Sequence, residues 1–342
     1  MKLRRYIFIL LPLIFIGFIA CNDRPIFAAI EQEIDLKDFS VEGNILSLLE
    51  AGENVYASNR GGVYSKSKKS DGSWSKILSV SGTQKLAHDN ANIVFACFGS
   101  GSVKYYEAGN WNTVPGSGNI RIIAGDNIVF GYDESQEKVF KIVKNAAPSE
   151  VIHSGKVDSL FAAGNYVVVK SGSSETMYKA DTSPAAAEGG LPGGVKGMCS
   201  AGDADKIFVL AGSSIHYYNG SDWSSNTKSI SDKTPISISY FKERKTILVG
   251  CTNGYTEVKL NTPINLSNAT QFNPGNSGST TPPGSYSQYQ TTLGSYYTYP
   301  VLGVDRDNGD YAVFMGIYSG VIKRNTGLWG FYSDKKREWN RE

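Results

Sequence analysis

The chain has 342 residues, of which 41% are apolar, 12% aromatic and 19% charged, so it is long enough to bury a large core and too hydrophobic to be disordered. Its 37 glycines and 20 tyrosines, without a long tract of helix-forming residues, disfavour a helical bundle and favour strands joined by tight turns. With 34 basic and 32 acidic side chains the net charge is +2, so no overall positive field points to nucleic acid as a partner.

The first twenty residues are typical of a secretory signal peptide. Lys2, Arg4 and Arg5 precede an apolar run over residues 6–20. A membrane-spanning helix needs roughly 20 apolar residues, so this run is too short to be one. We predict that residues 1–20 are removed from the mature protein.

The end of this run, Phe18-Ile19-Ala20-Cys21, resembles the lipobox of bacterial lipoproteins. The resemblance implies cleavage after Ala20 and acylation of Cys21, with palmitate as an acyl chain, so that the protein is anchored to the membrane without a spanning helix. Asn22 stands where the family's inner-membrane retention signal has aspartate, which favours the outer membrane, facing the periplasm or the surface. Ordinary cleavage near Ala28, leaving an unlipidated protein, is the alternative. Residues 21–37 are then a tether.

The other cysteines are Cys97, Cys199 and Cys251, an odd number spread widely along the chain. There is no CxxC pair and no Cys/His cluster, so the sequence predicts neither a disulfide framework nor a metal site. Each cysteine lies in an apolar run that is typical of a strand, and we expect it to be a small buried hydrophobic residue.

An apolar run, a polar turn and a second apolar run recur along the chain at intervals of about 40 residues, the length of one β-propeller blade. A third apolar run follows in each copy, and in four copies a tryptophan then begins a fourth strand: Trp74, Trp111, Trp223 and Trp329. The second run occurs seven times: Val55-Tyr56-Ala57, Ile93-Val94-Phe95, Ile128-Val129-Phe130, Tyr166-Val167-Val168, Ile207-Phe208-Val209, Thr246-Ile247-Leu248 and Tyr311-Ala312-Val313.

The repeats predict an all-β fold, a seven-bladed β-propeller over residues 38–334. It resembles the WD40-like or YVTN-like propellers of bacterial envelope proteins, although the Gly-His and Trp-Asp signatures of eukaryotic WD40 repeats are missing. Residues 328–333 are expected to form the outer strand of the seventh blade, and residues 33–36 could add an edge strand that latches the ring. Residues 335–342 are interpreted as a charged tail whose removal is tolerated.

One interval is longer than the others because residues 261–299 form an insertion rich in Asn, Ser, Thr, Pro and Gly. We expect it to contain the outer strand of the sixth blade and then a long excursion. Such a loop is either functional or disordered, so an ordered binding loop or cap and a flexible linker both remain open. Its end carries several tyrosines, whose amphipathic rings suit a binding surface.

Motifs for catalysis, cofactors and metals are absent. His88, His153 and His216 are isolated from one another, and no HExxH, GxSxG, P-loop or dinucleotide-binding pattern occurs. The segment from Asp305 to Asp310 has a glycine, Gly309, where an EF-hand calcium loop needs an oxygen ligand. We therefore predict no cofactor and no metal site.

Two other functions remain open. One alternative is a propeller glycoside hydrolase or a glycan-binding protein, because the segment Ser70-Asp71-Gly72-Ser73-Trp74 resembles a compressed Asp-box of sialidase-type propellers. Glycoside hydrolysis needs two carboxylates about 5 to 10 Å apart, and carboxylates that are distant in the sequence could converge to that separation in a propeller. An outer-membrane assembly scaffold is the other, although the propeller lipoprotein of that machinery has eight blades.

The sequence favours a monomeric lipoprotein that binds or acts as a scaffold without catalysis. Its expected partner is a protein or a polymer of the envelope, such as a glycan, which it engages through one propeller face. In propellers the loops between second and third strands share one face with the connections between blades. The binding residues predicted there are an arginine and aromatic residues, the types that contribute most to binding: Arg60, Phe98, Tyr132, Tyr286, Tyr289, Tyr296, Tyr297, Tyr299 and Tyr318.

Overall fold

The computed structural model describes residues 37–181, 183–272, 296–318, 326–334 and 339–342. The chain divides into two compact units, residues 1–36 and 37–342, and only the second is described. None of the described helices has the length and apolar character needed to cross a membrane. The predicted signal peptide, Cys21, the edge strand at 33–36 and two of the predicted tyrosines, Tyr286 and Tyr289, lie outside the described residues.

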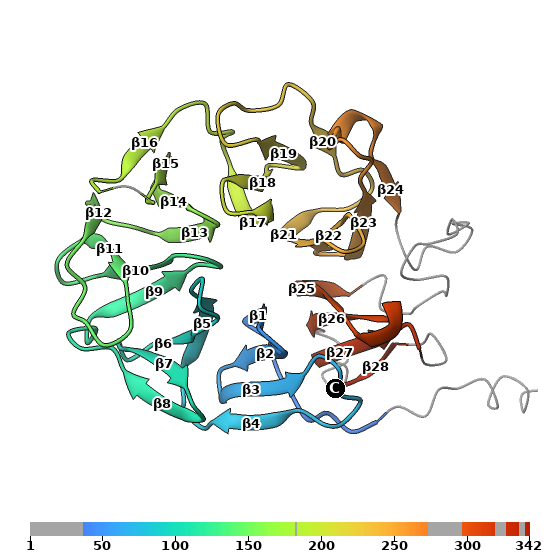
Figure 1. Ribbon diagram of the computed structural model, residues 1–342, viewed down its shortest axis with the longest axis horizontal. Coiled ribbons are helices and arrows are strands. Elements are labelled where there is room, and N and C mark those ends of the chain that lie inside the picture. The colour runs from blue at the N-terminus through green and yellow to red at the C-terminus, as the bar shows by residue number, and fades with distance from the viewer. Residues whose placement is uncertain (1–36, 182, 273–295, 319–325, 335–338) are drawn as a thin grey trace, which may run out of the picture. The chain divides into compact units, whose positions relative to one another are not determined.

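The described unit is a ring of antiparallel sheets around a central axis, and the first strand of each sheet lies innermost (Figure 1). Five sheets have four strands each. The first sheet consists of β1 (Ser47–Ala51), β2 (Asn54–Asn59), β3 (Gly62–Ser67) and β4 (Ser75–Leu78). The second consists of β5 (Thr83–His88), β6 (Val94–Phe98), β7 (Val103–Glu107) and β8 (Asn110–Thr113). The third consists of β9 (Ile120–Ala124), β10 (Val129–Asp133), β11 (Lys138–Ile142) and β12 (Val151–Ser154). The fourth consists of β13 (Ser159–Ala163), β14 (Tyr166–Ser171), β15 (Ser174–Lys179) and β16 (Ala186–Glu188). The fifth consists of β17 (Val195–Asp203), β18 (Lys206–Ala211), β19 (Ser214–Tyr218) and β20 (Lys228–Ser229).

The remaining eight strands form one continuous sheet. Its strands are β21 (Pro235–Phe241), β22 (Thr246–Cys251), β23 (Gly254–Lys259), β24 (Thr270–Phe272), β25 (Tyr297–Asp305), β26 (Tyr311–Tyr318), β27 (Gly327–Tyr332) and β28 (Trp339–Arg341). Two short 3-10 helices, η1 (Leu266–Asn268) and η3 (Asp307–Gly309), lie in its connections.

The fold is thus an all-β propeller, as predicted, but with five separate four-stranded blades and not seven. The strands expected to make a sixth and a seventh blade are joined, because β23 pairs in parallel with β25 through Gly254 and Tyr297. The Gly254 N–H also donates to the Tyr296 carbonyl at 2.6 Å. The outer strand expected within the insertion is β24, whereas residues 273–295 lie outside the described part.

The core consists of layers of apolar side chains between neighbouring sheets. The second strand of a blade is covered on both faces, and so it is a continuous apolar run: Ile247, Leu248 and Val249 of β22 are fully buried. Cys97 and Cys251 are buried, Cys199 is half-buried, and all three are free thiols. Their predicted role as small strand residues is confirmed for the two buried ones.

The end of the chain differs from the expectation. Residues 328–333 were predicted as the outermost strand, but all except the last lie in β27, which follows β25 and β26 in the sheet. The outermost strand is β28, which pairs with β27. β28 lies in the segment that was interpreted as a charged tail, so that interpretation is wrong for residues 339–342. Glu342 is buried, and its carboxylate accepts from Lys66 Nζ at 2.7 Å and from Trp74 Nε1 at 2.9 Å.

Candidate functional site

The innermost strands surround a central cavity of about 1030 Å³, and each of these strands contributes residues to its wall. A cavity of this size is in the range that holds a ligand or an inserted segment of a partner. Because the first, second and third strands of each repeat run antiparallel to one another, the loop between the second and third strands lies on the face where the innermost strand begins. We call this the start face and the opposite one the end face.

Two of the predicted tyrosines form an exposed pair at the start face. Tyr297 begins β25, Tyr318 ends β26, and the two residues are directly paired in the sheet. Their rings meet edge to face with centroids 6.2 Å apart, and 40% and 48% of these residues are exposed. Among the described residues the other exposed large hydrophobic residues are Val143 and Val151, which belong to the third blade. Arg60 is exposed too, in the loop between β2 and β3.

Phe98 and Tyr132 were predicted to lie on this surface, and the structure corrects both predictions. They are at the start-face ends of β6 and β10, but they are only 1% and 4% exposed. Each packs in an apolar layer between sheets. Tyr296 is half-buried against the core of the eight-stranded sheet. These three residues therefore stabilise the fold and offer little surface to a partner.

Tyr299 lies inside the cavity, where it meets a residue that the sequence analysis did not select. Lys85, on β5, places its ammonium group 4.8 Å from the centre of the Tyr299 ring and donates to the Tyr299 hydroxyl. Lys196, on β17, lines the same cavity, and its ammonium group donates to the Pro235 carbonyl at 3.2 Å. The signal that could have found both lysines is a charged residue in the first strand of the repeat.

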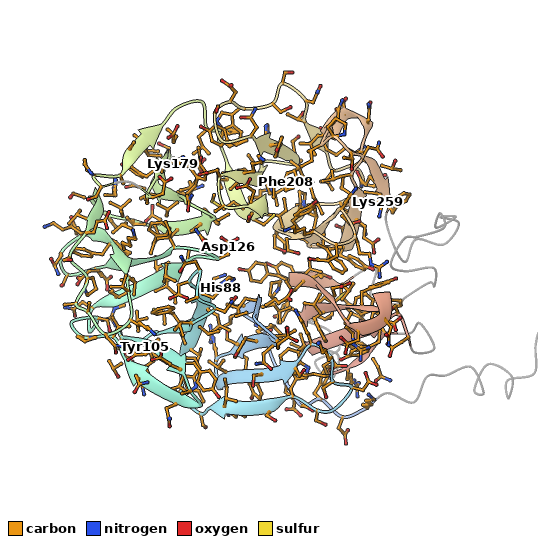
Figure 2. The ribbon with its side chains drawn as sticks, viewed as in Figure 1. His88, Tyr105, Asp126, Lys179, Phe208 and Lys259 are labelled. Carbon is orange, nitrogen blue, oxygen red and sulfur yellow. The ribbon has the colours of Figure 1, made fainter. Side chains whose placement is uncertain are left out.

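The opposite end of the cavity contains Asp126 and His88, which lie near one another at the inner edge of the ring (Figure 2). The Asp126 carboxylate accepts from the backbone N–H of Gly164, in the next blade, and from that of Ser200, one blade further, at 3.3 Å. Gly164 has a φ of +56°, and a Cβ there would lie 2.0 Å from the Ala204 carbonyl oxygen, so the close approach of these turns requires glycine.

Burial raises the pKa of Asp126, although the hydrogen bonds from Gly164 and Ser200 and the nearby His88 oppose the rise. Burial, together with the nearby Asp126, also holds the pKa of the Cys199 thiol well above its usual range. Cys199 is thus a poor nucleophile at neutral pH. Within the described part of the chain, no three His, Cys, Asp or Glu side chains are grouped so that they could hold a metal ion.

The turns on the end face are tied from blade to blade by side chains at equivalent positions of the repeat. Asn127 Nδ2 donates to Asn165 Oδ1 at 2.8 Å, and Asn165 Nδ2 donates to Asp205 Oδ1 at 3.0 Å. Lys179 Nζ adds an ion pair with Asp205 at 3.1 Å. Many polar groups of the end face therefore bind other blades, whereas the start face exposes aromatic rings.

Comparison with known proteins gives one family and one fold. The profile of the TP013X lipoprotein family matches residues 8–342. Two proteins of Treponema pallidum (strain Nichols), both described as uncharacterised lipoproteins, are 25% and 24% identical over 94% of this chain, with 93% and 95% of their own lengths covered. A chain in the crystal structure of the mitotic checkpoint complex superposes with a TM-score of 0.56 at 12% identity, over 87% of this chain and 95% of that one. That likeness shows the propeller fold alone.

Proposed function

The chain belongs to the TP013X lipoprotein family, and from that premise we propose that it is a lipid-anchored protein of the bacterial envelope that binds a partner through the start face without catalysis. The anchor in this proposal is Cys21, and the membrane is the outer one. The partner is an envelope protein or polymer that reaches the ring at the mouth of the central cavity.

The exposed pair of Tyr297 and Tyr318 is the observation that carries this proposal. Aromatic side chains contribute much of the free energy of binding when a partner covers them, and apolar rings left exposed side by side mark interaction surfaces. The paired strands β25 and β26 fix the backbone at both positions, and the two rings contact each other edge to face, which lowers the conformational entropy that is lost when they are covered.

A role without catalysis is supported by the interactions of the carboxylates that line the cavity. Glycoside hydrolysis needs one carboxyl group that donates a proton and a second that acts as nucleophile or base. Glu50 is held by Lys68 at 2.8 Å, and Asp126 is held by the two backbone N–H groups described above. Asp158 accepts from the Gly172 N–H at 2.6 Å, so three of the four carboxylates among the described residues that line the cavity, all except Glu243, are engaged by the protein itself.

The proposal is tested by capture of envelope components on the immobilised protein. We expect Tyr297→Ser combined with Tyr318→Ser to reduce the recovery of the captured partner about tenfold, which corresponds to about 1.4 kcal/mol. The control variant, Val143→Ser combined with Val151→Ser, removes the other exposed large hydrophobic side chains of the described residues. It should retain full capture.

Melting temperatures close to wild type in both double variants would show that the fold is intact. The proposal fails if the tyrosine variant captures as much as wild type, or if the valine control loses capture to the same extent.

A further inference from the structure

We propose that the cavity contains a carboxylate-binding site formed by Lys85, Lys196 and Tyr299, and that the partner inserts an acidic peptide segment into it from the start face. This inference rests on the proposed function in one respect, since it takes the start face as the side from which the partner approaches. It adds the chemical class of the ligand and the residues that recognise it.

The three residues share a structural feature, which is an irregularity in the innermost strand. The pairing of β5 with β6 shifts between Thr83 and Leu86, and Lys85 lies in that shift. Lys196 lies in the shift of β17, and Tyr299 in that of β25. A bulge releases a residue from the regular alternation of the strand and redirects its side chain, and all three residues line the cavity.

Lys85 and Lys196 also occupy matching positions in the second and fifth blades. Lys85 immediately precedes Leu86, which pairs with Ala96, and Lys196 immediately precedes Gly197, which pairs with Leu210. In both blades the lysine follows the first pair of the innermost strand, Thr83 with Phe98 in β5 and Val195 with Ala211 in β17, and lies in the shift before the next pair. The lysines therefore lie at a similar depth, on the walls that two different blades contribute.

The charges of these two lysines are not neutralised by the protein. A neutral oxygen lies beside each ammonium group, the Tyr299 hydroxyl for Lys85 and the Pro235 carbonyl for Lys196. Within the described residues neither lysine forms an ion pair with a carboxylate. Arg121, near the same mouth, differs because it is paired with Glu134 at 3.2 Å.

Four carboxylates of the described residues also line the cavity, but Glu50, Asp126 and Glu243 lie toward the end face, and Asp158, at the start face, accepts from the Gly172 N–H at 2.6 Å. The two lysines are thus cations without a carboxylate partner near the start face, where low-dielectric walls strengthen their attraction for an anion.

The neighbouring groups favour a carboxylate on a peptide. The Tyr299 oxygen accepts from Lys85, so its own proton remains available for a second acceptor. A carboxylate has two oxygens, which can accept from an ammonium group and from a hydroxyl at once. On the same face, but outside the lining of the cavity, the exposed rings of Tyr297 and Tyr318 offer apolar surface to the rest of the segment.

The probe for the test is a fluorescein-labelled hexaglutamate peptide, with hexalysine as the peptide of opposite charge. Binding is measured by fluorescence anisotropy over a series of salt concentrations. We expect hexaglutamate alone to bind, with affinity that falls as salt rises. Lys85→Gln and Lys196→Gln should each weaken binding about tenfold. The control Lys242→Gln removes a lysine that lines the cavity at the end face, and it should change affinity less than about twofold.

Three outcomes would overturn the inference: no binding of hexaglutamate at low salt, equal binding by wild type and the two lysine variants, or binding of a hyaluronan oligosaccharide in place of the peptide. The two proposals can also be separated. If Tyr297→Ser with Tyr318→Ser loses partner capture while the lysine variants bind hexaglutamate as wild type does, the proposed function survives and the carboxylate site does not. If the lysine variants lose affinity for hexaglutamate but the tyrosine variant captures the partner as wild type does, the carboxylate site survives and the proposed function does not.

Discussion

Asp133, at the end of β10, shows how a single side chain organises a loop of the start face. Its Oδ1 accepts from Ser135 N at 2.9 Å, from Ser135 Oγ at 2.7 Å and from Gln136 N at 3.0 Å, and its Oδ2 accepts from Gln136 Nε2 at 3.2 Å. Burial by itself would raise the pKa of Asp133, but these hydrogen bonds outweigh it and hold the pKa below its usual 3.8.

The direction of this shift gives a pH-dependent prediction. A carboxyl group with a lowered pKa in the folded state stabilises the fold above its unfolded pKa, and the contribution is lost as the pH falls through the folded value. Asp133→Asn should therefore lower the free energy of unfolding by about 1 to 2 kcal/mol at pH 7. The difference from wild type should narrow once the pH falls below 3.8.

The measurement is denaturant unfolding over a range of pH. Glu137→Gln is the matched control, since Glu137 is exposed in the same loop and the substitution removes the same charge. A difference between Asp133→Asn and wild type that stays constant down to pH 3 would contradict the assignment of the stabilisation to the ionised carboxylate.

At the scale of elements, β28 and Glu342 close the ring against the first blade. The Lys66 ammonium group lies on β3, and it donates to Glu342 Oε2 and to the Tyr332 hydroxyl. Lys66 and Glu342 are 5% and 6% exposed, and burial lowers the pKa of Lys66 although the nearby Glu342 opposes the shift. A second link lies beside it, where Arg306 pairs with Asp71 and with Asp334.

We expect Glu342→Ala to destabilise the whole propeller by about 3 to 5 kcal/mol, because it leaves a buried ammonium group without its counter-ion. Removing residues 335–342 should cost at least as much, since β28 is lost too. Lys66→Met combined with Glu342→Leu should be less damaging than Glu342→Ala alone, because no buried charge remains. Thermal unfolding of the three variants checks the order, and a truncated chain that melts like wild type would show that β28 contributes nothing.

At the scale of the whole molecule, the propeller and the predicted lipid anchor are separate features of one chain. The family profile covers residues 8–342, so both the predicted lipobox and the propeller fall within it. We expect Cys21→Ser to move the protein from the membrane to the soluble fraction, because no acyl chain can then be attached. Fractionation and palmitate labelling measure this, with Cys199→Ser as the cysteine-removal control. A wild-type protein that takes up no palmitate, or a Cys21→Ser variant that stays in the membrane, would contradict the anchor.

The tertiary contacts explain where prediction from the sequence stopped. Phe98 and Tyr297 are both aromatic residues at strand ends on the same face, and nothing in the local pattern distinguishes them. Phe98 is buried because the neighbouring sheet covers it, whereas Tyr297 is exposed to solvent beside Tyr318. The short polar pattern before Trp339 is likewise compatible with a tail, and it becomes a strand only because β27 offers its edge.

The sequence by itself determined the all-β propeller, because the repeat of apolar runs and turns about every 40 residues reflects local strand and turn preferences that each blade satisfies in the same way. Only the tertiary structure decided the number of separate blades, the closing strand and the residues that face the cavity. Each of these depends on contacts between segments far apart in the chain, as between Lys66 and Glu342 or between Lys85 and Tyr299. Such contacts are determined by how neighbouring sheets pack and where their strands bulge, which the spacing of residues along the chain does not record.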